Sequence, residues 1–360
     1  MVRMKVPQCA PVFDDETRAA VDAVLLSGFV TEGPQCEAFT AELLAYMRAP
    51  YGCLVSNGTV ALMLALWAVV GDPTEGLGPI GEWRPDIQLA SVYVPTLTFA
   101  ATANAVIATG GVPMLYESGS CYAGDAAVIP VWLFGNRPVW PDALDDGLVV
   151  EDAAQAIGCW VDGKHAGTFG DVGCFSFYAD KTLTTGEGGF VVTRDRAIWE
   201  RLEQLRNHGR SKGARGYAHE AFGINARMTD VQAAIGRCQL RHLDDWIAVK
   251  LEHWHHYARE LGGLPDVTVW PVDNGCAPFR FVINVPDPVA LAAYLEEREI
   301  QTRRMFLPLH RQPFLSRYAH GDYPNADYAY AHGLLLPCHQ YLCEDQVAFV
   351  CEAVRAFYGK

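Results

Sequence analysis

The sequence has few of the features that mark membrane, nucleic-acid-binding or secreted proteins. It contains no basic run, and 28 Lys and Arg stand against 42 Asp and Glu, which gives a net charge of −14. Such a chain is not expected to bind nucleic acid or an anionic membrane. The longest apolar stretch, Val60 to Val70, is much shorter than the roughly 20 residues of a membrane span. Residues 1–7 also lack the apolar run of a secretory signal peptide.

The eleven cysteines show neither a metal-binding nor a disulfide pattern, because the count is odd and no Cys-x-x-Cys pair occurs. Scattered thiols in a chain of this length are usually small buried hydrophobic residues. We therefore expect a cytoplasmic protein with reduced cysteines and no metal site. A Gly-x-Gly-x-x-Gly motif after a first strand, which a nicotinamide-dependent Rossmann enzyme needs, is also missing.

The chain does have the composition of a large folded protein, with 360 residues of which 50% are hydrophobic. Its length predicts two unequal domains. A helix is expected after Asp14-Asp15, ending at Gly28, and residues 56–70, apolar on every side, indicate a buried helix. Continuous apolar runs alternate with helical stretches, which predicts a mostly parallel sheet covered on both faces. The predicted strands are 91–95, 128–133, 147–151, 174–178 and 189–193.

The second half shows a different pattern of predicted helices and strands. Two long helices are predicted at 229–243 and 245–261, followed by an alternating strand at 279–285. Further helices are predicted at 288–298 and 344–358. We place the domain boundary near residue 245, with a larger domain at 1–245 and a smaller α+β domain at 246–360.

Two segments of the larger domain predict a site for an anion and a cation. Ser56-Asn57-Gly58-Thr59 precedes the buried helix, where free N–H groups and the helix dipole attract a phosphate; the alternative is an ordinary helix cap. Glu151-Asp152 follows a buried strand, at the sheet edge where α/β proteins bind ligands. The alternative for this pair is a solvated strand end.

Two further segments complete the candidate site. Lys181 lies between Ser176 and Gly189 among small and glycine residues. A lysine held in a pocket can lose its proton and bind a carbonyl carbon, although a lysine in a solvated loop is the other interpretation. Phe99 follows the strand 91–95. It is either an aromatic ring at the same edge of the sheet or an ordinary residue of the hydrophobic core. Anion site, carboxylate, aromatic ring and lysine together suit pyridoxal 5'-phosphate (PLP).

These segments resemble the DegT/DnrJ/EryC1/StrS family of sugar-nucleotide aminotransferases over nearly the whole chain. The lysine segment ending in Gly186-Glu187-Gly188-Gly189 is the most specific part. Other matching segments are Gly28, Thr31 to Pro34, His208-Gly209, Gly223 to Met228 and Pro308 to Pro313. The resemblance implies an α/β protein with the PLP-dependent transferase fold of type I, similar to aspartate aminotransferase. It has a mostly parallel central sheet in the large domain.

The resemblance also implies roles for individual residues. Lys181 would bind the cofactor and move the proton, and Asp152 would pair with the pyridine nitrogen, so these two are the expected catalytic residues. Gln155 would hydrogen-bond the ring hydroxyl, and Phe99 would stack on the ring. The cofactor would alternate between PLP and its amine form, pyridoxamine phosphate.

The phosphate would be bound by the backbone amides of Gly58 and Thr59 and by the Ser176 hydroxyl. Asn225 would reach the phosphate of the neighbouring subunit's cofactor, which implies a homodimer with shared active sites. The alternative is that Asn225 caps the helix beginning near residue 229. The expected substrate-binding residues are Thr31, Arg303 and His310.

The sequence departs from the family pattern in two places. Residues 116–127 form a shorter stretch than in most relatives, and Arg303-Arg304 stands where relatives more often have Arg-Pro or an aromatic residue. The lysine segment is most similar to that of 4-aminotransferases, which act on nucleotide-linked 4-keto-6-deoxy sugars with glutamate as the usual donor. The alternatives are a 3-aminotransferase, a 3-dehydratase, which would have histidine in place of Lys181, and a PLP-binding sensor without turnover.

Overall fold

The computed structural model describes residues 4–70, 91–117, 127–139, 147–211, 213 and 218–359. The α-helices of these ranges are α1 (Asp15–Ser27), α2 (Pro34–Met47), α3 (Gly58–Val70), α4 (Ala101–Ala108), α5 (Arg196–Leu205), α6 (Asp230–Arg241), α7 (Leu243–Leu261), α8 (Pro288–Glu296), α9 (Pro324–His332) and α10 (Glu344–Phe357). The strands are β1 (Tyr51–Val55), β2 (Ser91–Pro95), β3 (Val112–Tyr116), β4 (Ala127–Val128), β5 (Val150–Asp152), β6 (Trp160–Val161), β7 (Lys164–His165), β8 (Val172–Ser176), β9 (Gly189–Thr193), β10 (Thr268–Val269), β11 (Phe281–Asn284), β12 (Arg303–Arg304) and β13 (Gly333–Leu336).

The larger part of the chain is built on a mostly parallel sheet, as predicted. Its strands form two hydrogen-bonded groups, with the strand orders β3-β2-β4 and β5-β8-β9-β1. Parallel bridges between Val128 and Val149 and between Val131 and Asp152 join β4 to the β5 segment. Within this sheet of described strands, β9 is antiparallel to both of its neighbours, and the other neighbouring pairs are parallel.

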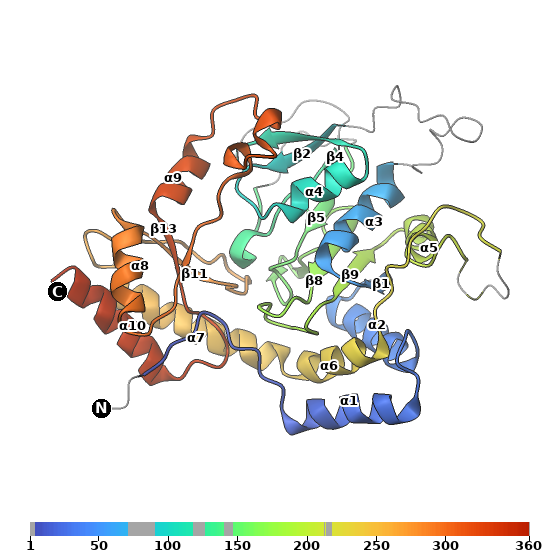
Figure 1. The fold of residues 1–360 in the computed structure, drawn as a ribbon, viewed down its shortest axis with the longest axis horizontal. Helices are drawn as coiled ribbons and strands as arrows, with labels where there is room; N and C mark the ends of the chain where they lie inside the picture. The colour runs from blue at the N-terminus through green and yellow to red at the C-terminus, as the bar shows by residue number, and fades with distance from the viewer. Residues whose placement is uncertain are drawn as a thin grey trace.

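Helices cover both faces of this sheet (Figure 1). Alternate residues of β9 pack into different clusters: Val191 contacts the cluster around α3 and α4, whereas Phe190 and Val192 contact the one around α2 and α6. This is the pattern of a strand buried on both sides. Among the described residues, no helix is long and apolar enough to cross a membrane.

The C-terminal part forms a second, antiparallel sheet with the strand order β10-β11-β13-β12. The side chains of β11 alternate in direction, as predicted, but both faces are buried. Phe281 and Ile283 pack with α7, α8 and α10, whereas Val282 packs with Phe134 and Met305. An alternating pattern therefore indicated two different apolar neighbours here, and not a solvent-exposed face.

The N-terminal segment crosses to this second sheet, where Val6 forms a parallel bridge with Ile300 and is fully buried. The first described residues accordingly lie beside the C-terminal elements (Figure 1). Helices α6 and α7 follow each other from the large sheet toward these elements and meet at His242. The boundary near residue 245 stays a prediction.

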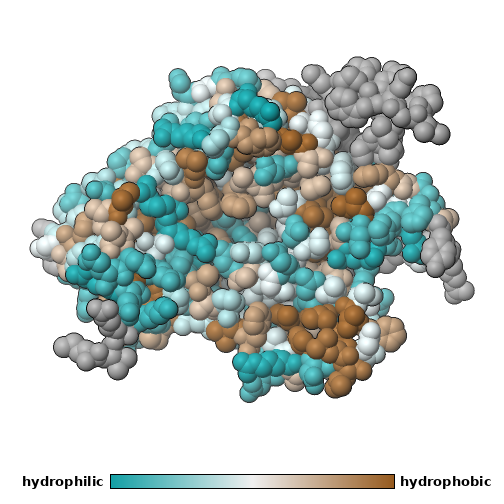
Figure 2. Space-filling view, viewed as in Figure 1, coloured by the Kyte–Doolittle hydropathy of each residue, from teal (hydrophilic) through white to brown (hydrophobic). Residues whose placement is uncertain are grey.

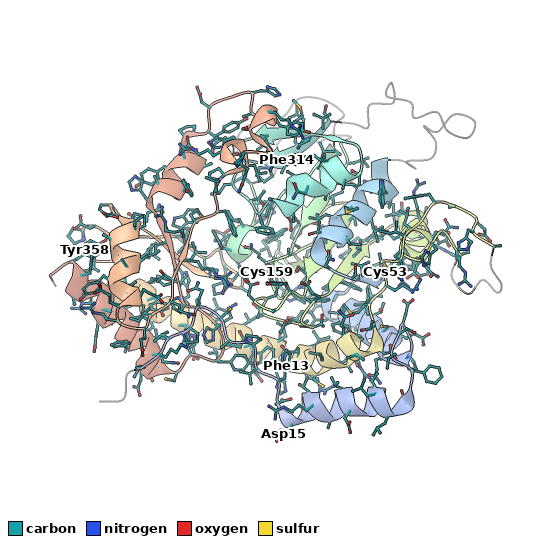
Figure 3. The ribbon with its side chains drawn as sticks, in the orientation of Figure 1. Phe13, Asp15, Cys53, Cys159, Phe314 and Tyr358 are labelled. Atoms are coloured by element: carbon teal, nitrogen blue, oxygen red, sulfur yellow. The ribbon has the colours of Figure 1, made fainter. Side chains whose placement is uncertain are left out.

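Several local predictions are confirmed. The Asp14 carboxylate accepts from the Thr17 N–H at 2.8 Å and caps α1, and Gly28 ends this helix with a φ of 75°. The predicted strands 91–95 and 189–193 coincide with β2 and β9. The ten cysteines of the described ranges form no disulfide with one another, and Cys53 and Cys159 lie in the interior (Figure 3).

The predicted strand at 128–133 is wrong beyond its first residue. Strand β4 ends at Val128, and the chain forms a short 3-10 helix at Leu133–Gly135. Pro130 has no N–H to donate to a ladder, although its carbonyl accepts from Asp152 N–H at 2.9 Å. The shortened segment 116–127 lies, from 118 to 126, outside the described residues.

Candidate active site

A cavity of about 760 Å³ opens at the carboxyl ends of the parallel strands. Its wall also includes the start of α3 and residues of the C-terminal part, and the surface is hollowed in the middle of the face shown in Figure 2. This is the edge at which α/β sheets bind ligands. The cavity brings together most of the residues predicted from the sequence: Gly58, Thr59, Phe99, Asp152, Gln155, Ser176, Lys181 and Arg303.

Asp152 is the last residue of β5 and its carboxylate is buried. One carboxylate oxygen accepts from the Thr102 hydroxyl at 2.8 Å, and the other accepts from the Ala154 N–H at 3.2 Å. Burial raises the pKa of Asp152, whereas the Thr102 and Ala154 hydrogen bonds and the Lys181 charge lower it. The structure thus provides a carboxylate facing the cavity, and not a solvated strand end.

Glu151, the neighbour of Asp152, points into the protein and has a different set of partners. Its carboxylate is fully buried and accepts hydrogen bonds at 2.7 to 2.8 Å from four N–H groups, those of the Trp132 indole and of the backbone at Gly167, Phe169 and Gly170. The sequence places both carboxylates next to each other at the end of the strand. Because strand residues alternate between faces, only Asp152 belongs to the cavity.

The start of α3 has the features of an anion site as well as those of a helix cap. The Asn57 side chain accepts from the Val60 N–H at 2.9 Å, and the first N–H groups of the helix at Gly58 and Thr59 have no acceptor in the described chain. A Cβ at Gly58 would lie 2.7 Å from the Ser176 Cβ. Since only glycine fits there, the backbone and the Ser176 hydroxyl can meet one phosphate group.

Lys181 lies in this cavity and not in a solvated loop. Its Nζ lies 4.6 Å from the centre of the Phe279 ring. Burial lowers the pKa of Lys181, the charges of Asp180 and Asp152 raise it, and those of Arg280 and Arg303 lower it. The neutral amine that attacks a carbonyl carbon is therefore more accessible here than in water.

Gln155 and Phe99 complete the predicted set. The Gln155 side-chain oxygen accepts from the Phe134 N–H at 2.7 Å, which orients the amide so that its NH₂ group is available to a ligand. Phe99 is not plain core, because 61% of it is exposed at the cavity. Its ring centre lies 6.0 Å from that of Phe306.

Thr31, Asn225 and His310 do not line the cavity of their own chain. The His310 ring forms hydrogen bonds with the Thr96 hydroxyl at 2.7 Å and with the Asp327 carboxylate at 2.8 Å, so it ties the loop after β2 to α9. Asn225 is exposed. It does not cap α6, because Thr229 does so in a capping box with Gln232; that alternative is wrong.

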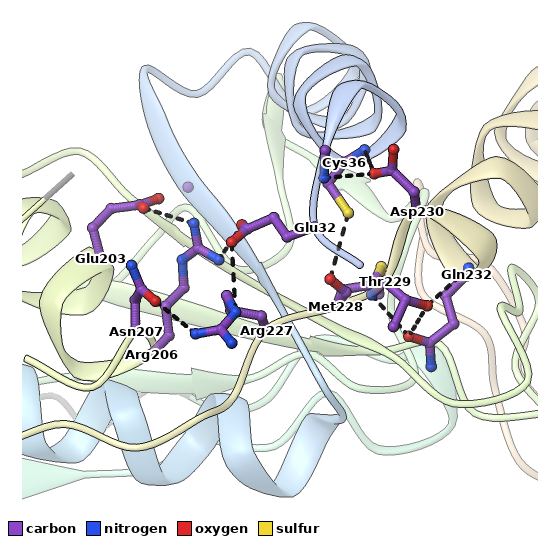
Figure 4. Close-up of polar contacts among 12 residues, drawn as sticks. Glu32, Cys36, Glu203, Arg206, Asn207, Arg227, Met228, Thr229, Asp230 and Gln232 are labelled. Carbon is purple, nitrogen blue, oxygen red and sulfur yellow. Dashed lines mark hydrogen bonds and ion pairs between the residues drawn. The ribbon is translucent and has the colours of Figure 1, made fainter. Parts of the chain in front are cut away.

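The loop that contains Thr31 is held by a polar network (Figure 4). Asp230 accepts from the backbone N–H groups of Gly33 at 2.8 Å and Cys36 at 2.9 Å. Glu32, the residue after Thr31, accepts from the buried Arg206. This loop therefore has a fixed shape in the isolated chain.

Sequence reasoning missed the residues that hold the side chains of Asp152 and Lys181 in place. Thr102 bonds Asp152, and Phe279, Arg280 and Asp180 surround Lys181. The only signal was Arg280, an arginine inside the alternating strand predicted at 279–285, which indicates a buried partner.

The residues of the cavity fit PLP, since they provide a candidate anion site that a Cβ would fill, a buried carboxylate and a half-buried lysine. Fold and site together define a PLP-dependent transferase of fold type I, an aminotransferase. The chain belongs to the DegT/DnrJ/EryC1/StrS aminotransferase family, whose model matches residues 11–120 and 126–355.

Individual relatives are similar over almost their whole length. The chain is 32% identical to the GDP-perosamine synthase of Vibrio cholerae, over 98% of this chain and 99% of that protein. It is 34% identical to the dTDP-3-amino-3,4,6-trideoxy-alpha-D-glucose transaminase of Streptomyces venezuelae, over 94% and 91%. The crystal structure of DesV from S. venezuelae superimposes with a TM-score of 0.84 at 33% identity, covering 96% of this chain and 95% of that one.

Proposed function

We propose that this enzyme transfers the amino group of an amino acid, L-glutamate, to C4 of a nucleotide-linked 4-keto-6-deoxy sugar. The observation that carries the proposal is the convergence of Lys181, Asp152 and the Gly58 anion site on one cavity. Similarity to a GDP-perosamine synthase over nearly the full length supports GDP as the nucleotide, and the resemblance of the lysine segment to 4-aminotransferases supports C4 as the position. We also propose that the enzyme acts in the cytoplasm, since its cysteines are scattered along the sequence and those of the described ranges form no disulfide with one another.

When bound, PLP supplies an aldehyde that takes up the amine and a ring that withdraws electrons. The chain's residues would hold and protonate the reacting groups. Gly58, Thr59 and Ser176 would bind the phosphate, and Phe99 would cover one face of the ring. Asp152, placed at the end of β5, would keep the ring nitrogen protonated.

Lys181 would carry the proton of the reaction at its Nζ. Its burial favours the neutral amine, which can accept a proton from the donor's α-carbon and return it at another atom. Gln155 would donate to the ring hydroxyl through the NH₂ group that its bond with Phe134 orients.

Arg303 is the best placed of the proposed substrate-binding residues. Its side chain is half exposed at the cavity, where it donates to Asp180 at 3.0 Å. A guanidinium group in this position suits an anionic substrate, either the diphosphate of a nucleotide sugar or the donor carboxylate. Thr31 and His310 remain predictions, and His310 would act by holding the loop that leads to Phe99.

Product analysis tests the function. The enzyme is incubated with glutamate and, in separate reactions, with nucleotide-linked 4-keto-6-deoxy and 3-keto sugars, and the nitrogen of each product is located by NMR. We expect nitrogen at C4. Nitrogen at C3 would identify a 3-aminotransferase, as the S. venezuelae relative is named. Loss of the 3-hydroxyl would identify a dehydratase, and a bound cofactor without turnover would identify a sensor.

We further propose a homodimer in which each site is shared. Figure 2 shows apolar side chains gathered over α1 and the chain after it. The exposed residues there are Leu25, Leu26, Phe29 and Val30, and a contiguous apolar surface of this kind is commonly an interface. A second copy of this chain would cover it and bring Asn225 to the neighbouring phosphate.

Replacing Asn225 by alanine is expected to weaken cofactor binding by about 1.5–3 kcal/mol, the range for a hydrogen bond to a charged group. To test whether it acts across the interface, Lys181→Ala and Asn225→Ala subunits are mixed and allowed to exchange. A mixed dimer would then contain one doubly damaged site and one intact site. We expect activity above that of either parent at limiting cofactor.

If Asn225 acts within its own chain, every site in the mixture keeps one lesion. Activity that stays at the level of the parents, with exchange verified by native mass spectrometry of differently tagged subunits, would show that the site is not shared in this way. A monomer at all concentrations tested would rule out the dimer itself.

A further inference from the structure

A second lysine is buried behind the reactive one. Lys250 lies on α7 and is only 3% exposed. Its ammonium group donates to the Thr182 hydroxyl at 2.8 Å and lies 3.5 Å from the Phe279 carbonyl oxygen. Both oxygens are uncharged, and no ion pair of Lys250 is formed by the described residues. Burying a cation without a carboxylate partner costs free energy, which makes Lys250 a candidate for a functional role.

The hydrogen bond from Lys250 reaches the residue next to Lys181 in the chain. Thr182 is itself buried, and its carbonyl oxygen accepts from the Gln340 side chain at 3.3 Å. Helix α7 and the loop after β13 therefore hold Thr182 by its side chain and by its backbone. Neither contact involves a residue of the large sheet.

The residue on the other side of Lys181 is held in the same manner. The Asp180 carboxylate accepts from Arg280 at 2.7 Å and from Arg303 at 3.0 Å, both from the C-terminal part of the chain. Lys181 is thus positioned between two residues that distant segments fix in place.

The Phe279 ring lies against both lysines. Its centre is 4.6 Å from the Lys181 Nζ and 5.6 Å from the Lys250 Nζ. Each distance is within the range of a cation–π contact. A displacement of Lys250 or Thr182 would therefore change both the direction of the Lys181 side chain and the surface on which it rests.

We propose that Lys250 is a positioning residue for Lys181: its buried ammonium group holds Thr182, and through it the reactive lysine, against the Phe279 ring. The proposal rests on the role of Lys181 given under the proposed function. It assigns Lys250 no contact with substrate or cofactor, since Lys250 does not line the cavity.

The charged and titratable groups around both lysines determine how a pH experiment is interpreted. Those that act on Lys181 are Asp180, Asp152, Arg280 and Arg303. Those that face Lys250 are Cys338, Cys159, Arg280, Asp180, His253 and His339. Burial, with the Arg280 charge, lowers the pKa of Lys250 to about 8. Removing Lys250 therefore removes a positive charge below that pH and a hydrogen-bond donor at any pH.

The first measurement uses the full chain freed of cofactor. Trace acetylation across a pH series, with mass spectrometry of the Lys181 peptide, gives the pH at which Lys181 becomes half neutral. In Lys250→Met we expect this midpoint to rise by about one pH unit, toward the ordinary lysine value of about 10.4, because a released Lys181 is better solvated. In the holoenzyme, kcat should fall about 10- to 100-fold, with the KM for the nucleotide sugar unchanged.

Variants of Thr182 separate positioning from a general loss of stability. Thr182→Val keeps the shape and removes the acceptor, and it should shift the Lys181 midpoint and kcat in the same direction. Thr182→Ser keeps the hydroxyl and should behave as the unaltered enzyme. The kcat of the double variant Lys250→Met/Thr182→Val should be no lower than that of the poorer single variant. Both substitutions remove the same hydrogen bond, between Lys250 and Thr182, so their effects should not add.

Lys164→Met is the matched control. Lys164 is exposed and lies 5.7 Å from the centre of the Phe169 ring, and its replacement should leave the Lys181 midpoint and kcat unchanged. A folded Lys250→Met protein with an unaltered midpoint would overturn the proposal. If that variant does not fold, an unaltered Lys181 midpoint in Thr182→Val would overturn the proposal instead. Borohydride trapping of the cofactor on another lysine would instead refute the proposed role of Lys181.

Discussion

Lys181→Ala is expected to reduce transamination to the background rate, because under the proposed function one side chain both binds the cofactor covalently and moves the proton. The protein should still fold, since the Lys181 side chain ends in a cavity and its neighbours Asp180 and Thr182 keep their own partners. Steady-state activity with glutamate and a keto sugar measures the effect. Circular dichroism and thermal unfolding verify the fold.

Borohydride reduction of the unaltered enzyme identifies the lysine directly. Peptide mapping should place the reduced cofactor on Lys181, and the yellow colour of the purified protein should bleach. Lys164→Ala, a change at an exposed lysine, should keep full activity and the same adduct. An adduct mapped to Lys250 or to any other lysine would contradict the assignment.

Asp152→Asn is expected to slow the chemical step by about 10²–10³-fold, the usual loss when one preorganised electrostatic group is removed. Asparagine has nearly the same shape and can still accept from the Thr102 hydroxyl, so the site should remain intact. It lacks the negative charge that, under the proposed function, would keep the pyridine nitrogen protonated. Single-turnover kinetics with glutamate isolate this step, and the absorbance of the bound cofactor reports occupancy.

The adjacent carboxylate provides the matched control. Glu151→Gln makes the same chemical change one residue earlier, on the opposite face of β5, where four N–H donors and no cavity surround it. That variant should lose stability, because an amide NH₂ group would face N–H donors, while its folded fraction keeps a near-normal rate. A near-normal rate in Asp152→Asn would mean that another group serves the ring nitrogen.

Features that depend on neighbouring residues could be predicted from the sequence. Asp14 and Gly28 delimit α1 as expected, because a capping side chain and a left-handed glycine act within one turn of the chain. The buried helix α3, the strands β2 and β9 and the Lys181 segment were recognised for the same reason. Each pattern is complete within about a dozen residues.

Features that depend on distant segments came only from the tertiary structure. Apolar runs do not show that β9 is antiparallel to its neighbours or that Phe281 and Val282 face two different cores. Nor could composition tell Asp152, which faces the cavity, from Glu151, which is buried among N–H groups. Side-chain direction becomes specific only when the register of a strand within its sheet is set.

The support of Lys181 shows the same division most clearly. The sequence alone indicated a reactive lysine, since its glycine-rich surroundings are local. Its environment is formed by Lys250, Arg280 and Gln340, which follow it by many residues and reach it through packing of the C-terminal sheet and α7. The identity of the reactive group is therefore readable from the chain, whereas its position and proton affinity depend on burial and on charges that only the folded protein brings together.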